Sequence, residues 1–476
     1  MKIPQNTVFN NVTIIDIAEE GKGIGKIDNW VVFVEQAVPG DVVDVVITYQ
    51  KKKFLQAKIV SFLTKSPFRA APFCEYFGTC GGCKWQHLSY DAQLHFKQKM
   101  VEDVMERVGG VSLKNFIKPI LSSCKTTYYR NKLEFTFSDK RWLDRDDLLN
   151  AEQLNLNAVG FHVPQRFDKV LDIQQCYLQA EPSNRIRNAL RDFAMSHQIS
   201  FYNLRQHEGV LRNLIIRTSS LSQSMVIVVF AYPSIEQIHL VMGYLQNSFP
   251  EITSLLYVVN QKKNDTIFDQ DVIVYSGESH ISEVMKTPQG KNLTFKISPK
   301  SFYQTNSEQA ERLYHVVWQL ANFKGDELVY DLYTGTGTIA NYIADSVAKV
   351  VGIEYVESAI TDAKINATVN DIDNTHFYAG DMKQMLNAAF VQQHGKPDVV
   401  VTDPPRAGMH ADVLTQLLQI LPAKIIYVSC NPATQARDIA LLLEKYELVA
   451  VQPVDMFPHT QHVENVILLA LKGGDS

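Results

Sequence analysis

The sequence predicts an α/β protein in three parts: an N-terminal OB-like β-barrel (residues 1–62), an α+β central domain (63–300) and a Rossmann-like C-terminal domain (301–476). Three observations indicate this division. Short β-rich runs with glycine turns fill the first part, strands and short helices mix in the second, and strands alternate with helical segments in the third. A chain of 476 residues is also too long for a single core.

The first part carries β-rich runs at 12–16, 31–34 and 42–47, with a turn at 39–41. Four or five short strands with such spacing predict a small barrel. Three consecutive lysines at 51–53 follow on an expected hairpin. A lysine-rich tip is either a solvated loop or, on an OB-like face, a contact for phosphate groups.

The central part predicts one clear helix and several strands. Ser89 is a good N-cap for an apolar pattern of helical period that continues to residue 108. Strands are expected at 133–137, 214–217, 225–230 and 255–259. These elements indicate an α+β domain without indicating its chemistry.

Composition and charge bound the class of protein. The longest apolar run, 225–232, is too short to span a bilayer, so we expect a cytoplasmic protein without a membrane partner. Residues 331–476 hold 9 Lys and Arg against 17 Asp and Glu, whereas residues 1–330 hold 37 against 34. The acidic end suits an enzyme domain, and the more basic part suits contact with a polyanion.

Three of the six cysteines cluster at the start of the central part. Cys74, Cys80 and Cys83 form a Cys-x5-Cys-Gly-Gly-Cys pattern. In a cytoplasmic protein such cysteines are more often metal ligands than disulfides. A fourth ligand is needed, and from the residues alone Cys124 and Cys176 are equal candidates. An all-thiolate set suits either zinc or an iron–sulfur centre.

The third part predicts a doubly wound sheet, with strands at 328–332, 350–353, 399–402, 425–429 and 466–471 and with one more strand, the third in chain order, that ends near Asp381. Ligands of such sheets bind outside the carboxyl ends of the parallel strands. The residues that directly follow these strands are therefore the candidates for a site.

A glycine turn and two acidic residues suggest the cofactor. Gly335 lies in the turn after the first strand, Glu354 ends the second strand, and Asp381 follows the third. Glycine lets a ligand approach backbone amides, and a carboxylate at the second strand end can accept ribose hydroxyls. The longer Gly-x-Gly-x-x-Gly turn is absent, which favours S-adenosylmethionine over NAD. The alternative is that these carboxylates are helix N-caps.

Asp403-Pro-Pro-Arg406 follows the fourth strand. The prolines fix a rigid turn and so the direction of the aspartate, which can read a flipped pyrimidine by hydrogen bonds. Arg406 stands where amino methyltransferases acting on adenine and cytosine carry a base-stacking aromatic residue. That chemistry is therefore disfavoured.

Cys430 ends the fifth strand, just before the turn Asn431-Pro432. A free cysteine is often only a small core residue. A thiolate placed here can instead add to carbon 6 of uracil and make carbon 5 nucleophilic, after which a base must remove the carbon-5 proton. Glu464 is the candidate base, and His459 and His462 are lower-ranked alternatives.

Together these segments resemble the RNA uracil-5 methyltransferases that use S-adenosylmethionine. The resemblance rests on motifs in family order, at 302–306, 331–338, 403–406, 429–432 and 462–464, and on a TRAM-like start at 20–26 and 39–41. It implies a methyltransferase domain in the third part, with Cys430 as nucleophile and Glu464 as general base. It places the cofactor at Gln304, Tyr333, Glu354 and Asp403, with Asp381 matching in position.

The cysteine pattern resembles the subset of this family that methylates 23S ribosomal RNA and carries a [4Fe–4S] cluster. That resemblance implies Cys176 as the fourth ligand, with zinc as the less favoured occupant, and makes Arg130 a candidate RNA contact. We expect a monomer acting on 23S rRNA, with tRNA as an alternative substrate. An inactive RNA-binding protein and a 5-methylcytosine-forming enzyme are further alternatives.

Overall fold

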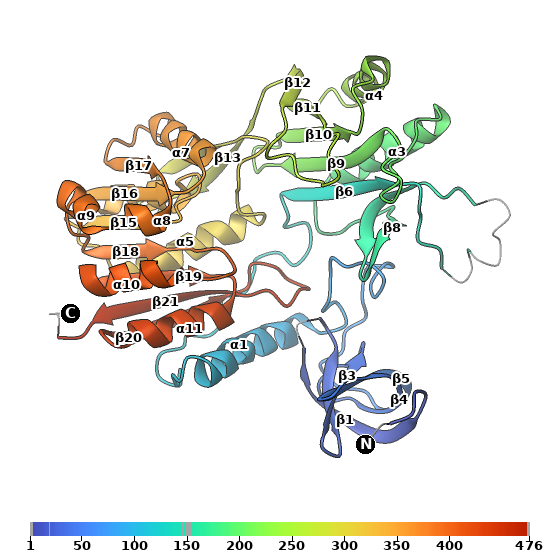
Figure 1. The fold of residues 1–476 in the computed structure, drawn as a ribbon, viewed down its shortest axis with the longest axis horizontal. Coiled ribbons are helices and arrows are strands. Elements are labelled where there is room, and N and C mark those ends of the chain that lie inside the picture. The colour runs from blue at the N-terminus through green and yellow to red at the C-terminus, as the bar shows by residue number, and fades with distance from the viewer. Residues whose placement is uncertain (1–2, 19, 145–146, 148–153, 474–476) are drawn as a thin grey trace.

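A computed structural model describes residues 3–18, 20–144, 147 and 154–473. The chain forms a small barrel, a central sheet and a C-terminal sheet, with a long helix, α1 (Tyr90–Arg107), running from the barrel to the C-terminal sheet (Figure 1). The predicted α/β class and its OB-like barrel are confirmed. No described helix has the length and apolar character needed to cross a membrane.

Five strands close the N-terminal barrel. They are β1 (Val8–Ile17), β2 (Gly23–Ile27), β3 (Trp30–Glu35), β4 (Val42–Gln50) and β5 (Phe54–Thr64), paired in the order β1-β2-β3-β5-β4. Along β4, Val43, Val45 and Ile47 are buried while the residues between them are partly exposed, which is the alternation of a strand with one face inward. The lysines at 51–53 lie on the hairpin between β4 and β5, as predicted.

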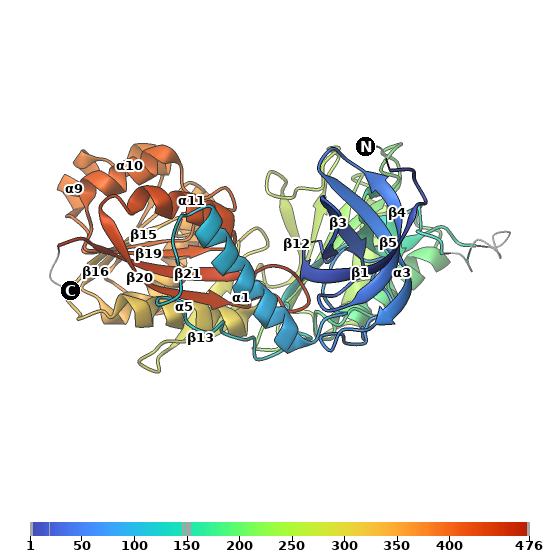
Figure 2. The same ribbon diagram turned by 90° about the horizontal axis from the view of Figure 1, so that it is seen from below.

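Helix α1 belongs to two parts of the molecule. Its N-cap is Ser89, whose side chain accepts a hydrogen bond from the amide of Ala92, as the sequence predicts. Its buried residues Val101 and Met105 pack into the core of the C-terminal domain beside α11 (Pro432–Leu442) (Figure 2). The helix therefore fixes the barrel-proximal segment to the C-terminal sheet.

The central sheet has seven strands in the order β12-β11-β10-β9-β6-β7-β8. They are antiparallel except for the β10–β11 pair. Helices α3 (Ser183–Ser196) and α4 (Ile235–Ser248) pack on it. The strands are β6 (Lys132–Ser138), β7 (Ala158–Val163), β8 (Arg166–Asp172), β9 (Leu211–Thr218), β10 (Ser224–Phe230), β11 (Ser254–Val259) and β12 (Val272–Gly277).

A hairpin, β13 (Ile281–Lys286) and β14 (Asn292–Ile297), follows the central sheet but packs against the C-terminal domain. Its buried side chains contact α5 (Ser307–Ala321) and α7 (Glu357–Val369). The amides of Thr294 and Lys296 donate to Asn370 and Asn366 of that domain. Residues before the expected boundary at 301 thus contribute to the C-terminal core.

The C-terminal sheet has the order β17-β16-β15-β18-β19-β21-β20, with β21 antiparallel to its neighbours. Helices α5, α6 (Thr338–Ile343) and α7 share one core with it, and α1, α10 (Ala411–Ile420), α11 and the short α8 (Met382–Met385) and α9 (Ala388–His394) share another. Its strands are β15 (Leu328–Leu332), β16 (Lys349–Glu354), β17 (Thr375–Ala379), β18 (Val399–Thr402), β19 (Lys424–Ser429), β20 (Tyr446–Val454) and β21 (Glu464–Leu471).

The five strands predicted by residue range for the C-terminal domain coincide with β15, β16, β18, β19 and β21. Strand β20 was not predicted. Its Pro453 argues against a strand in sequence, but an edge strand tolerates proline because it need not donate on its outer side. Strand order reverses between β15 and β18, and such a switch point opens a crevice at the carboxyl ends of the strands.

Candidate active site

The turn after β15 has the backbone conformation that its glycines allow. Gly337 has a φ of +72°, and a Cβ at this position would lie only 2.8 Å from the ring of Phe377. Gly335 has a φ of +55° and donates its amide to Glu354 Oε2 at 3.2 Å. The glycines therefore bring the turn against the end of β16, where the predicted ribose-binding carboxylate lies.

Two backbone amides hold the carboxylate of Glu354, which keeps further acceptor positions for a ligand. Its Oε1 accepts the amide of Val356 at 3.0 Å and its Oε2 that of Gly335. A carboxylate has about four acceptor positions, so positions for two hydroxyl groups remain. Asp381 instead accepts the amide of Lys383 at 3.0 Å and caps α8, the alternative role that the sequence left open.

Tyr333 lies in the same turn, and the 302–306 segment reaches that turn through the carbonyl of Phe302, which accepts Thr336 Oγ1 at 3.5 Å. Burial raises the pKa of Tyr333 to about 12, and the charges of Asp438, Asp381 and Glu354 add to that rise. The backbone carbonyl of Gln304 accepts Asn131 Nδ2 at 2.8 Å. Through this bond the 302–306 segment is tied to the central domain beside Arg130.

Two buried carboxylic acids, Asp331 in β15 and Asp403 directly after the neighbouring strand β18, influence each other's ionisation. Burial raises the pKa of Asp331 to about 7, although the hydroxyl of Thr334 donates to it at 2.5 Å. Burial likewise raises the pKa of Asp403 to about 7, and the charge of Asp331 adds to the rise. Ionising one of these carboxyl groups therefore disfavours ionising the other.

Cys430 lies between β19 and α11 and is partly buried. Burial raises the pKa of its thiol to about 11, and the charges of Glu464 and Asp403 raise it further. Arg406 acts in the opposite sense, through its charge and through a hydrogen bond to the thiol. The structure thus brings the predicted nucleophile, the predicted base and the predicted base reader into one cluster.

The sequence analysis named Arg406 but did not predict that it acts on the thiol of Cys430. Its backbone carbonyl accepts Asn431 Nδ2 at 3.0 Å and the hydroxyl of Thr434 at 3.1 Å, which fixes the turn after β18 to the residues that follow Cys430. Only the strand order, which makes β18 and β19 neighbours, brings this cation to the thiol. Its place three residues after Asp403 is the signal that was available.

Glu464 begins β21 and is 5% exposed. Burial raises its pKa well above the usual value, Asp403 raises it further, and Arg406 opposes both. In contrast, burial lowers the pKa of His459 and of His462 to about 4. Burial thus raises the proton affinity of Glu464 and lowers that of both histidines, which makes the glutamate the stronger base of the three.

The four cysteines chosen from the sequence line one cavity of about 180 Å³. Burial raises the pKa of Cys80 to about 11 and that of Cys83 to about 12, and the charges of Cys74 and Cys176 raise both further. Cys124 lies elsewhere: it is exposed, and its sulfur accepts a hydrogen bond from Arg312 at 3.2 Å.

The arrangement of these four thiols differs from that of a compact single-metal site. Within the described ranges, no three His, Cys, Asp or Glu side chains are grouped tightly enough for one metal ion. Four thiolates on a single zinc would lie about 3.8 Å from one another, given Zn–S bonds of about 2.3 Å. Among the described residues the four thiols therefore share a cavity without forming such a compact group.

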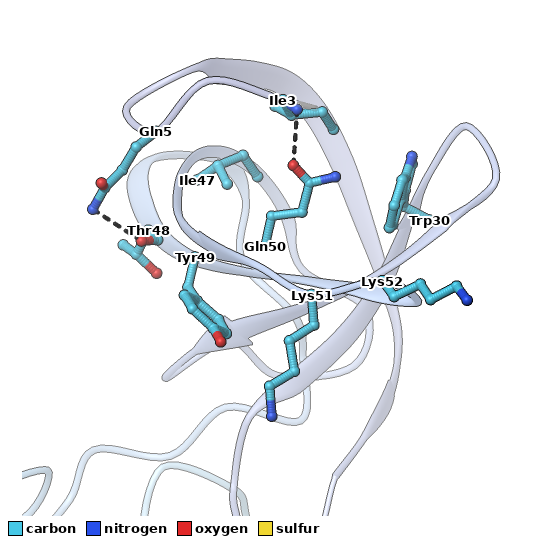
Figure 3. A pocket seen from close by; sticks show the side chains of 9 residues that line it. All are labelled: Ile3, Gln5, Trp30, Ile47, Thr48, Tyr49, Gln50, Lys51 and Lys52. Atoms are coloured by element: carbon cyan, nitrogen blue, oxygen red, sulfur yellow. Dashed lines mark hydrogen bonds between the residues drawn. The ribbon is translucent and has the colours of Figure 1, made fainter. Parts of the chain in front are cut away.

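The barrel carries an open pocket of about 620 Å³ (Figure 3). Trp30, Tyr49, Lys51 and Lys52 line it, and the amide of Ile3 donates to Gln50 Oε1 at 2.8 Å across its rim. Aromatic and cationic side chains on an OB-like barrel are typical of nucleic-acid contact. This pocket is formed by the barrel alone and includes none of the residues around Cys430.

The chain matches two family models. The model described as tRNA (Uracil-5-)-methyltransferase matches residues 218–472, and that of the TRAM domain matches residues 10–60. An uncharacterized RNA methyltransferase of Bacteroides thetaiotaomicron is 56% identical, over 96% of this chain and 100% of its own length. Another from Porphyromonas gingivalis is 51% identical, over 96% and 98%.

One solved structure is similar over almost the whole chain. It is the crystal structure of the Pyrococcus abyssi tRNA (uracil-54, C5)-methyltransferase in complex with S-adenosyl-L-homocysteine. The TM-score is 0.73 and the identity 27%, with 97% of this chain and 100% of that chain covered.

Proposed function

The chain belongs to the tRNA (Uracil-5-)-methyltransferase family, and from this premise we propose that it methylates carbon 5 of a specific uridine through a covalent bond between Cys430 and carbon 6. Family membership assigns the broader activity, S-adenosylmethionine-dependent methylation of uracil in RNA. The observation that carries the finer proposal is the cluster of Cys430, Arg406, Glu464 and Asp403 at adjoining strand ends.

S-adenosylmethionine would supply the methyl group from its sulfonium centre. Glu354 has acceptor positions for its ribose hydroxyls, and Gly335 leaves room at the turn. Tyr333, Asp381 and Gln304 complete the proposed binding site. These residues hold the methyl donor on the β15–β16 side of the crevice, while Cys430 lies on the β19 side.

The protein's own groups carry the remaining steps. Asp403 hydrogen-bonds the polar edge of the flipped uracil. The Cys430 thiolate, favoured by Arg406, forms a bond to carbon 6, and the electron pair of the carbon 5–carbon 6 double bond becomes available at carbon 5 for the methyl group. Glu464 then takes the carbon-5 proton, the double bond re-forms, and the sulfur–carbon 6 bond breaks to release the thiolate.

The mechanism predicts that substitutions of Cys430 and of Glu464 stop the reaction at different steps. Cys430→Ala should abolish methyl transfer, because nothing else activates carbon 5. Glu464→Gln should form the methylated adduct but not release it, so a protein–RNA band should survive a denaturing gel. Turnover at the wild-type rate by Cys430→Ala would refute the covalent mechanism. Failure of wild-type protein to bind S-adenosylmethionine in calorimetry would favour an inactive RNA-binding protein.

The same trapped adduct identifies the substrate. We propose 23S rRNA, which the cysteine pattern supports. The similarity to the Pyrococcus abyssi tRNA (uracil-54, C5)-methyltransferase supports tRNA as the second candidate. Sequencing the RNA bound covalently to Glu464→Gln protein in cells distinguishes the two. Recovery of tRNA alone would overturn the rRNA assignment.

We further propose that Cys74, Cys80, Cys83 and Cys176 hold a [4Fe–4S] cluster. Their shared cavity and the Cys-x5-Cys-Gly-Gly-Cys pattern support this proposal. The cluster would organise the segments that carry Arg130 and the aromatic residues next to the cysteines. No step of the reaction passes through it.

A further inference from the structure

We infer that Phe73, Tyr128 and Tyr177 form a stacking platform for an unpaired base of the substrate RNA, outside the pocket that takes the target uridine. This inference rests on the proposed function for the identity of the polymer. Phe73 precedes Cys74 and Tyr177 follows Cys176, so the cysteine cavity brings both rings to one place. Phe73 is 40% exposed and Tyr128 43% exposed.

The three rings touch without covering one another. The centroids of Phe73 and Tyr177 lie 5.4 Å apart at an interplanar angle of 83°, and those of Tyr128 and Tyr177 lie 6.2 Å apart at 56°. None of these contacts places two ring faces against each other. Faces of exposed rings are the surfaces on which nucleic-acid bases stack.

The backbone at Tyr128 is held in an unusual conformation. Its φ of +53° lies in the left-handed region, which is disfavoured for a large aromatic residue. The amide of Tyr128 donates to the carbonyl of Tyr177 at 2.7 Å, and that of Arg130 donates to Leu178 at 2.8 Å. These bonds fix the Tyr128 ring beside Tyr177, and such strained positions concentrate at functional sites.

The platform adjoins the proposed active site. The ring of Phe73 lies 5.0 Å from that of His459, on the loop that leads to Glu464. Arg130, two residues after Tyr128, lies 5.1 Å above the Phe457 ring of the same loop. Burial lowers the pKa of His462, and the charges of Arg406, Lys97 and Arg130 lower it further, so both arginines act on this side chain of the same loop.

Charge indicates RNA rather than a protein as the occupant. Lys125 and Arg130 flank Tyr128, and Lys125 is 62% exposed in an ion pair with Glu308 at 2.8 Å. An exposed pair of this kind is weak, so its lysine can readily contact a phosphate instead. Exposed rings beside two cations fit a nucleotide, with its base on the rings and its phosphate on the cations.

The test separates base stacking from phosphate binding. The probes are a labelled oligouridylate of about ten nucleotides and an abasic ribose-phosphate chain of the same length. Wild-type protein should prefer the base-bearing chain, and Tyr128→Leu or Tyr177→Leu should each reduce that preference about tenfold, as expected for one lost stacking contact. Tyr128→Phe should retain it. Phe268→Leu, at a 70% exposed ring on another loop, is the matched control.

Each outcome decides the inference. Equal binding of both probes by wild-type protein, or an unchanged preference in both leucine variants, would overturn the platform. Binding requires neither Cys430 nor the methyl donor, so this assay stands apart from the test of methylation. If Cys430→Ala were active and the leucine variants still lost their preference, the covalent mechanism would fall and the platform would remain.

Discussion

At the residue scale, Cys430 is surrounded by groups with opposed effects on its ionisation. Burial and two neighbouring carboxylates favour the neutral thiol, whereas Arg406 favours the thiolate. A buried nucleophile with a pKa of about 11 is almost fully protonated at neutral pH. The charge of Arg406 therefore raises the fraction of thiolate that is available for attack.

Replacing that cation should shift the titration of the thiol. In Arg406→Gln the pKa of Cys430 should rise above its value of about 11, because the charge and the hydrogen bond that stabilise the thiolate are both lost. Each unit of rise lowers the thiolate fraction at neutral pH about tenfold. Alkylation of the Cys430 peptide by iodoacetamide, followed across pH by mass spectrometry, measures the shift. Arg205→Gln, at an exposed ion pair with Asp168, is the control; an unshifted profile in Arg406→Gln would contradict the assignment.

At the scale of elements, helix α1 holds the loop between β20 and β21. Lys97 Nζ donates to Asp455 Oδ1 at 2.6 Å and to the carbonyl of Phe457 at 3.0 Å, and both charged side chains are fully buried. The hydroxyl of Tyr90 donates to the other oxygen of Asp455 at 2.8 Å. This loop ends at Glu464, so the helix fixes the start of the strand that carries the proposed base.

The buried pair should be costly to break from one side only. Lys97→Met leaves the Asp455 charge buried without its cation and should destabilise the protein by about 3–5 kcal/mol. Lys97→Met combined with Asp455→Asn removes both charges and should recover much of that loss. Unfolding of wild type, both single variants and the double variant gives the coupling energy. Additive losses would show that the pair contributes no coupling.

Local patterns predicted the elements, but contacts distant in sequence escaped prediction. Ser89 and the strand-end positions of Cys430 and Asp403 follow from neighbouring residues, and the structure places them as expected. Lys97 and Asp455 lie 358 residues apart, so no local pattern could pair them. Cys176 and Cys124 differ only in the cavity that the fold builds, which is why the residues alone left them equal.

At the scale of the whole molecule, the segment after Cys83 connects all three parts. Trp85 is 1% exposed and packs with Val38 of the barrel and with Phe96 of α1. The amides of Lys84 and Trp85 donate to the carbonyl of His459 at 2.8 and 3.0 Å. The chain that leaves the cysteine cavity is thus hydrogen-bonded to the loop that delivers Glu464.

This connection predicts that the proposed cluster stabilises the loop at 457–464, which leads to Glu464. Cys83→Ser should lose the brown colour and the roughly four irons expected of a cubane cluster, because one of its four ligands is gone. Loss of the cluster should also weaken the hydrogen bonds from the amides of Lys84 and Trp85 to the carbonyl of His459. Amide hydrogen exchange at 457–464 should therefore accelerate. Cys124→Ser, which changes a cysteine outside the cavity, should alter neither. Colourless wild-type protein with one zinc would refute the cluster, whereas iron loss with unchanged exchange would show that the loop is held independently of it.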